Sequence, residues 1–437
     1  MIRDLWQGLP VIAQDILLLV ALLLPMVTIG LLLNRRFSVS PLIAAMLWRF
    51  RWTNVTFVAL IAIAVGMGAA LIAQEDAIRT GTAKAANKFE IIISAPGSEM
   101  TMMLASVYLQ PSDVALLDGD VYNAVASHEQ VEIAAPLAFG DSFRGAPIVG
   151  TTEAFARYLS DDRVAGRGWN DRFEAIAGTA SGLAVGDTFE PSHGRGDAVE
   201  AGAHDQSLTV VGTLPRTGTP WDRAILVPVE TVWSVHGLAS GHAPRNADQI
   251  GPPFDSAYFP GTPAIIVKAT ELWANYALHS TFNRQEETMA FFPATVLSEL
   301  YRVMGDVRQA MSLMSLVTQT LVAASVLLAL FILTRLFSRQ MALLRAVGAP
   351  ARFLVATIWG YCAMLIVAGT AVGLGVGQLA ASVLSGVITE RTDILVQASL
   401  GWSELYLAAG FASGVLLLAL IPAVAVLRQP LLENLRA

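Results

Sequence analysis

Histidines and carboxylates gather in one glycine-rich stretch, PSHGRGDAVEAGAHDQ, at residues 191–206. Imidazole nitrogens and carboxylate oxygens are ordinary zinc ligands, so His193, His204 and Asp205 are candidate ligands of a Zn²⁺ ion, with a zinc-linked role outside the cytoplasm. A flexible loop does not by itself bring such groups together. The alternative hypothesis is that these histidines, like the other four in the chain, are solvated surface residues.

Sequence motifs of common catalytic sites are absent. The chain has no GxxxxGK[ST] phosphate loop, no HExxH motif and no GxSxG motif, so no ATP-binding, protease or esterase site is indicated. A single cysteine, Cys362, excludes a disulfide framework. The net charge of −7 argues against a nucleic-acid partner. We therefore expect a non-enzymatic protein without a cofactor of its own, apart from the zinc hypothesis.

Five stretches without charged side chains are long enough to cross a bilayer, for which about 20 residues suffice. They are residues 16–33, 53–73, 311–334, 353–389 and 405–427. None contains a histidine or an acid, so ion-coupled transport is not indicated. The fourth exceeds one span, so part of it must project beyond the lipid or turn back. The sequence predicts an α-helical polytopic membrane protein with about five transmembrane helices.

Arginines without neighbouring acids mark alternate ends of these stretches. They are Arg35, Arg36, Arg49 and Arg51 after the first, and Arg335, Arg339, Arg345 and Arg352 after the third. Because Lys and Arg near helix ends mark the cytoplasmic side, both loops are expected in the cytoplasm. Residues 74–308 and the short loop around Glu390, Arg391 and Asp393 are then outside it. The expected location is the inner (plasma) membrane.

Residues 74–308 regain glycine, proline and charge, and they contain short β-branched runs bounded by turn residues, as strands do. The runs are at 89–93, 146–150, 207–212, 224–228 and 264–268, with helical patterns at 152–159 and 271–279 between them. We expect one large mixed α+β extracytoplasmic domain between the second and third transmembrane helices. The helical segments on either side of it would continue those two spans outward as a stalk.

The segment SRQMALLRAVGAPARFL, residues 338–354, predicts a short amphipathic helix at the cytoplasmic end of two spans. Met341, Leu344 and Val347 recur every three residues on one side with Leu343 beside them, and Gly348 is suited to end the helix. Such a helix either lies on the bilayer surface or docks into a groove of a cytoplasmic protein. The residues alone leave both interpretations open.

The stretch LLRAVGAPARFLVATIWGYCAMLIVAGTAVGLGVG resembles the core of FtsX-like permeases, in which a Leu-Arg-Ala-Leu-Gly-Ala turn joins two membrane helices and the second is glycine-rich. SPLIAAMLWRFRWTNVTFVALIAIAVGMGAAL and AVLRQPLLENLRA are similar to the family's first span and ending. VEIAAPLAFGDSFRGAPIVGTTEAF, GRGWND, GDTFE and LTVVGTL resemble, in this order, the periplasmic domain of MacB-type members. The resemblance covers residues 37–437, and the additional N-terminal span departs from the four-span MacB pattern.

The resemblance implies the permease subunit of an ABC transporter of the mechanotransmission type. It would work in membrane lipid with a second permease copy and a dimer of separate ATPase subunits that bind ATP and Mg²⁺. The coupling helix in the ATPase groove would consist of Met341, Leu343, Leu344, Arg345, Ala346, Val347 and Gly348. Arg345 would face acids of the ATPase or, alternatively, extend to the lipid boundary.

Two functions are compatible with that family. One is export or extraction of a lipoprotein, lipid, peptide or drug; the other is a non-transporting FtsX-like complex that regulates a periplasmic enzyme, with that protein as a further partner. The large MacB-like segment favours transport.

Glycines recur in two predicted spans, as Gly66 and Gly68 in the second and as Gly369, Gly373 and Gly377 in the fourth. Small residues let helices approach closely in lipid, so these glycines are expected to pack helices within the permease or at a dimer seam. The alternative is that glycine is simply common in membrane helices.

The predicted organisation has six parts. They are an additional N-terminal span (1–36), an elbow helix with the second span (37–75), a periplasmic MacB-like domain with stalk (76–308), a third span (309–337), the coupling helix (338–352), and two spans with a C-terminal tail (353–437).

Overall fold

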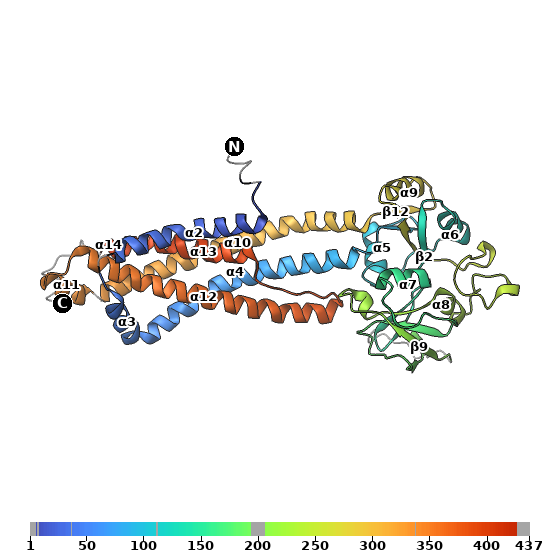
Figure 1. Ribbon diagram of the computed structural model, residues 1–437, viewed down its shortest axis with the longest axis horizontal. Coiled ribbons are helices and arrows are strands. Elements are labelled where there is room, and N and C mark those ends of the chain that lie inside the picture. The colour runs from blue at the N-terminus through green and yellow to red at the C-terminus, as the bar shows by residue number, and fades with distance from the viewer. Residues whose placement is uncertain are drawn as a thin grey trace. The chain divides into compact units, whose positions relative to one another are not determined.

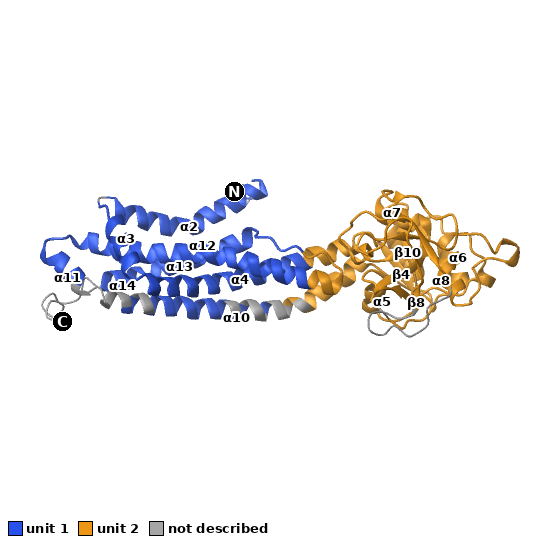
Figure 2. Ribbon diagram, turned by 90° about the horizontal axis from the view of Figure 1, so that it is seen from below, with its two compact units in different colours: residues 1–78, 306–387, 397–437 blue, residues 79–305, 388–396 orange. Residues whose placement is uncertain are grey.

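The computed structural model describes residues 6, 8–35, 37–110, 112–193, 206–336 and 338–425. The chain divides into two compact units, which Figure 2 shows in blue and orange. Unit 1 consists of residues 1–78, 306–387 and 397–437, and unit 2 of residues 79–305 and 388–396. The predicted extracytoplasmic domain thus falls in unit 2, together with a short segment from much later in the chain.

Unit 1 is built from helices (Figure 1). They are α2 (Val11–Asn34), α3 (Ser40–Arg49), α4 (Arg51–Ala86), α10 (Pro293–Leu336), α11 (Ser338–Ala346), α12 (Ala351–Thr392), α13 (Trp402–Leu418) and α14 (Leu420–Ala425). Three of them, α4, α10 and α12, continue as unbroken helices past the residues at which unit 2 begins or ends.

Four helical segments of the described residues are long and apolar enough to cross a membrane, judged by length and composition. They are Val11–Asn34, Arg51–Ala86, Ala351–Thr392 and Trp402–Ala425. The predicted stretch at 311–334 lies in α10, where the described apolar part is the shorter Leu316–Leu328. The fifth span therefore stays a prediction. The long fourth stretch does not turn back, because α12 is one helix of 42 residues.

Hydrogen bonds satisfy several buried polar groups of unit 1, where an unpaired polar group in an apolar surrounding is costly. The indole nitrogen of Trp359 donates to the Leu416 carbonyl at 3.0 Å. Tyr361 donates its hydroxyl to Asn54, whose amide donates to the Leu47 carbonyl at 2.9 Å. These bonds connect α12 with α13 and α4 within one apolar cluster.

α2, the predicted additional N-terminal span, packs on α13. The Tyr406 hydroxyl donates to the Asp15 carboxylate at 2.6 Å, and the Ser413 hydroxyl donates to the Leu22 carbonyl at 2.6 Å. Gly30 of α2 lies against the Trp359 ring, since a Cβ there would be 3.4 Å from it.

Unit 2 is a mixed α+β domain, as the sequence predicts, and its described strands form two sheets. The smaller is antiparallel throughout, in the order β12 (Met289–Phe291), β1 (Ile91–Ser94), β11 (Ala264–Ala269) and β2 (Val131–Pro136). The larger runs β5 (Ala165–Gly166), β9 (Leu208–Thr213), β6 (Glu174–Ala177), β10 (Ile225–Pro228), β4 (Ala146–Thr151), β3 (Asp141–Phe143) and β8 (Ser192–His193), with β7 (Thr188–Phe189) beside β9. Within it, β6–β9 and β10–β4 are parallel pairs.

The helices that lie wholly within unit 2 are short. They are α5 (Glu99–Ser106), α6 (Gly119–Ala126), α7 (Glu153–Ser160), α8 (Val229–Val235) and α9 (Ala274–Phe282), with 3-10 turns η2 (Pro220–Asp222), η3 (Pro244–Asn246) and η4 (Ser256–Tyr258). The side chains of Ser98, Asp118 and Thr152 cap α5, α6 and α7 by accepting a hydrogen bond from a first-turn N–H. One core cluster, which includes Ile91, Ile148, Ile225 and Val267, draws on both sheets.

Candidate coupling surface

α11 is a separate short helix because Gly348 reverses the chain after it. Gly348 has a φ of +99°, a conformation that side chains other than glycine rarely adopt. Its N–H donates to the Arg345 carbonyl at 3.0 Å, and the N–H of Ala349 donates to the Leu344 carbonyl at 2.9 Å. These bonds satisfy carbonyls that a helix end otherwise leaves unpaired. α12 then starts at Ala351.

One side of α11 is anchored in the apolar cluster of unit 1. Met341 is only 2% exposed, and it belongs to the same cluster as Ile43 of α3 and Leu354 and Trp359 of α12. Leu344 packs against that cluster while partly exposed. The position of α11 is therefore fixed by contacts within the chain.

The opposite side of this segment is apolar and exposed. Leu343 is 50% exposed and Val347 is 88% exposed, and Ala346 between them is also exposed. Val347 is thus not on the side of Met341 and Leu344, contrary to the grouping expected from the sequence. Six residues turn a helix through 600°, which leaves Val347 about 120° away from Met341. Arg345 is half-buried.

The glycines of the second and fourth predicted spans lie against each other in unit 1. A Cβ on Gly66 of α4 would be 2.9 Å from the Gly373 carbonyl oxygen, and one on Gly377 of α12 would be 2.7 Å from the Gly66 carbonyl oxygen. Gly369 faces Ile61 at 2.7 Å. Gly68 instead faces α10 and α13, where a Cβ would be 2.6 Å from the Gln319 side chain. The missing side chains leave room for backbone approach at these points.

The histidines whose side chains the structure describes have partners within unit 2. His242 lies 3.4 Å from Glu230, and both side chains are almost fully buried. His236 lies 3.6 Å from Asp141 while its Nδ1 is 2.7 Å from the Val232 carbonyl. His279 stacks on Phe292. Within the part of the chain that the structure describes, no group of three His, Cys, Asp or Glu residues is placed to hold a metal ion.

The zinc hypothesis stays a prediction. Of its residues, His193 lies in β8, where its backbone pairs with Asp141 of β3. His204 and Asp205 lie outside the described residues.

The GRGWND segment at 166–171 is held by one carboxylate. Glu174 of β6 accepts from two guanidinium nitrogens of Arg167, one of them at 2.6 Å, and from the backbone N–H of Asn170 at 2.6 Å. The paired guanidinium is the main cause that lowers the pKa of Glu174 from 4.5 to about 2. Trp169 of the same segment is 5% exposed and lines a cavity of about 350 Å³ together with Asp248.

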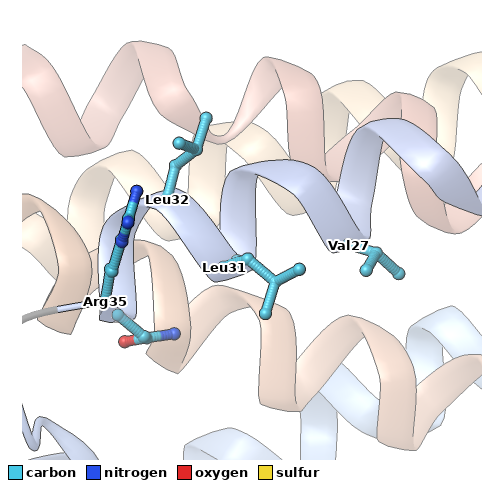
Figure 3. Close-up of a pocket in the computed structure, with 6 residues that line it drawn as sticks. Val27, Leu31, Leu32 and Arg35 are labelled. Carbon is cyan, nitrogen blue, oxygen red and sulfur yellow. The ribbon is translucent and has the colours of Figure 1, made fainter.

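An open groove of about 640 Å³ runs along the C-terminal half of α2 (Figure 3). Val27, Leu31 and Leu32 line it, and Asn34 and Arg35 are at its end. A mainly apolar surface on a candidate span suits lipid acyl chains.

Comparison with known proteins gives matches to solved structures alone. No protein-family model and no curated protein matches the chain. The periplasmic region of MacB from Actinobacillus actinomycetemcomitans is matched at 10% identity and a TM-score of 0.31, covering 49% of this chain and 95% of that one. The extracellular domain of the noncanonic ABC-type transporter YknZ from Gram-positive bacteria is matched at 11% identity and a TM-score of 0.26, covering 46% and 98%.

Proposed function

We propose that this chain is the permease subunit of an ABC transporter of the mechanotransmission, MacB-like type. A separate cytoplasmic ATPase would bind at α11, and ATP hydrolysis there would drive a conformational change of unit 2 that exports or extracts a substrate. Two permease copies and an ATPase dimer are expected, in the inner membrane with unit 2 in the periplasm.

The observation that carries this proposal is the two-sided packing of α11. Met341 fixes the helix to the unit 1 cluster, whereas Leu343 and Val347 leave an apolar strip uncovered. An exposed apolar strip on a rigid support is typical of a docking surface. A rigid support also suits force transmission, because a push on α11 reaches α3 and α12 through buried contacts.

Three further features support the same proposal. Four described segments qualify as membrane spans. α4, α10 and α12 each run unbroken from unit 1 residues to unit 2 residues. The sequence resembles MacB-type permeases over residues 37–437.

A pull-down from the native host tests the docking strip. We expect the tagged chain to co-purify with a P-loop ATPase, identified by mass spectrometry. Leu343→Asp places a charge in the strip and should reduce the recovered ATPase by about tenfold or more, the effect of losing a central interface contact.

Leu238→Asp is the matched control, because Leu238 of unit 2 has a similar exposure of 52%. It should leave ATPase recovery unchanged. If the wild-type chain never recovers an ATPase, the proposed function is wrong. Equal recovery by Leu343→Asp and wild type would instead favour the bilayer-surface interpretation of α11.

A further inference from the structure

Residues 388–396, which follow the apolar part of α12, belong to unit 2 rather than unit 1. Asp393 directly follows the last turn of α12 and has a φ of +56°. Its N–H donates to the Thr389 carbonyl at 3.0 Å, and the N–H of Val396 donates to the Thr389 hydroxyl at 3.0 Å. This segment, called the latch below, is therefore a folded turn.

An ion pair ties the latch to the body of unit 2. The guanidinium of Arg223, which directly follows η2, lies 3.2 Å and 3.4 Å from the two carboxylate oxygens of Asp393. Both side chains are partly shielded, with 34% and 21% of their surface exposed. Shielding from water makes such a pair more effective than one on an open surface.

A backbone hydrogen bond adds a second connection. The N–H of Leu395 donates to the Gly218 carbonyl at 3.2 Å. The loop that carries Gly218 is itself held by the buried carboxylate of Asp222, which accepts from the N–H of Thr217 at 2.7 Å and the N–H of Gly218 at 2.8 Å. The Gly218 carbonyl that accepts from the latch is thus held in place by contacts of its own loop.

Two glycines allow the latch to approach. A Cβ on Gly81, in the unit 2 part of α4, would be 3.1 Å from the Leu395 carbonyl oxygen and 3.2 Å from the Ile394 side chain. Gly218 has a φ of +76°, and a Cβ on it would be 3.2 Å from the Leu395 side chain. Ile394 and Val396 are 8% and 4% exposed. The latch therefore packs closely on other parts of unit 2, with Ile394 and Val396 buried.

The two ends of α12 have different attachments. Its first residue, Ala351, follows the turn that ends α11, and its last residues are part of the latch. A continuous helix of 42 residues is about 63 Å long at 1.5 Å per residue. The candidate coupling surface and the latch are thus connected by one unbroken hydrogen-bonded helix.

We propose that the latch is a coupling element through which α12 transmits displacement from α11 to unit 2. This path would act in addition to α4 and α10, the helices that also run from unit 1 residues to unit 2 residues. Arg223 and Asp393 are positioning residues in this element, because their ion pair holds the end of α12 to unit 2. This proposal rests on the proposed function, since the displacement would originate at the ATPase.

Hydrogen–deuterium exchange on the full chain with its co-purified ATPase, in lipid nanodiscs, tests the latch. The wild-type complex should show an ATP-dependent change in exchange in unit 2, for example in β11. Asp393→Arg and Arg223→Asp should each speed exchange of the Leu395 amide about fivefold or more, the effect of one lost hydrogen bond. Each should also lose most of the ATP-dependent change in β11.

The double variant Arg223→Asp/Asp393→Arg restores opposite charges and should recover both signals. Arg391→Ala, which removes an exposed charge from the same turn, should resemble the wild type. If both single variants keep the full ATP-dependent change in β11, the latch has no coupling role and this proposal is wrong. If no ATPase co-purifies, or the wild type itself does not respond to ATP, the proposed function is wrong. The latch proposal is then wrong as well, because it depends on that function.

Discussion

At the scale of single residues, Glu174 shows how one carboxylate organises a recognisable motif. Arg167 and the N–H groups of Asn170 and Asp171 all donate to it. Hydrogen bonds to the ionised carboxylate favour the charged form, which is why its pKa falls to about 2. The GRGWND segment is therefore shaped by a residue that lies outside it in the sequence.

Protonation of Glu174 should weaken unit 2. Because the pKa is lower in the folded state than the free value of 4.5, the contribution to stability is complete above about pH 5. It is lost as the pH falls through 4.5 toward 2. Glu174→Gln should cost about 1 kcal/mol at pH 7 and remove this part of the acid dependence.

The effect is measured by urea titration of the full chain in detergent at several pH values. Unfolding of unit 2 is monitored through the hydrogen-exchange protection of β6 and β9. Glu153→Gln is the control, since Glu153 pairs with Arg157 on the surface of α7 and should leave the acid dependence in place. An unchanged acid dependence in Glu174→Gln would contradict this assignment.

Residue-level prediction succeeded where the signal was local. The sequence placed the turn at Gly348 because glycine is suited to end a helix. It did not find the pair of Arg223 and Asp393, which are far apart in the chain and belong to no periodic pattern. It also grouped Val347 with Met341, because a three-residue spacing drifts around a helix of 3.6 residues per turn.

At the scale of elements, close approach of α4 and α12 depends on glycines in register. Gly66 faces Gly373 and Gly377, and the nearest atoms are backbone atoms that have little freedom to move. Added volume at such a contact must separate the helices.

Gly373→Ala should therefore destabilise unit 1 by about 1–3 kcal/mol, the range for overpacking in a tight core. A Cβ at Gly373 would be 2.9 Å from the Ala62 carbonyl oxygen, whereas one at Gly375 would have nothing within 4 Å. Gly375→Ala on the same helix is thus the matched control and should be neutral or slightly stabilising. Thermal unfolding of the full chain in detergent should show a lower Tm for Gly373→Ala alone; equal Tm values would refute the contact.

Element prediction followed β-branched runs and missed the six-residue strand β2 as well as the shortest strands. The five β-branched runs correspond to β1, β4, β9, β10 and β11, and the two helical patterns to α7 and α9. Two-residue strands such as β5 and β7 carry too few residues for an alternating pattern. The order of strands in the two sheets depends on contacts between distant segments, which local patterns do not contain.

At the scale of the whole molecule, the arginine distribution predicts which side of the membrane each loop faces. The single native cysteine, Cys362, is fully buried, so introduced cysteines can be labelled against a low background. Ser38 and Ala239 are both exposed and lie in unit 1 and unit 2 respectively.

In spheroplasts, a membrane-impermeant maleimide should label Ala239→Cys at once and Ser38→Cys only after permeabilisation. The wild-type chain serves as the blank. Labelling of Ser38→Cys in intact spheroplasts would reverse the predicted orientation and, with it, the cytoplasmic placement of α11.

α2 has a consequence for stoichiometry. It occupies a face of α13 through Asp15 and Ser413, and that face would be open in a relative that has only four spans. In the proposed pair of permease copies, the second copy would meet α13 through α2 or approach from another flank. Deleting the first helix should therefore change how the two proposed copies meet, as well as how stably each one folds.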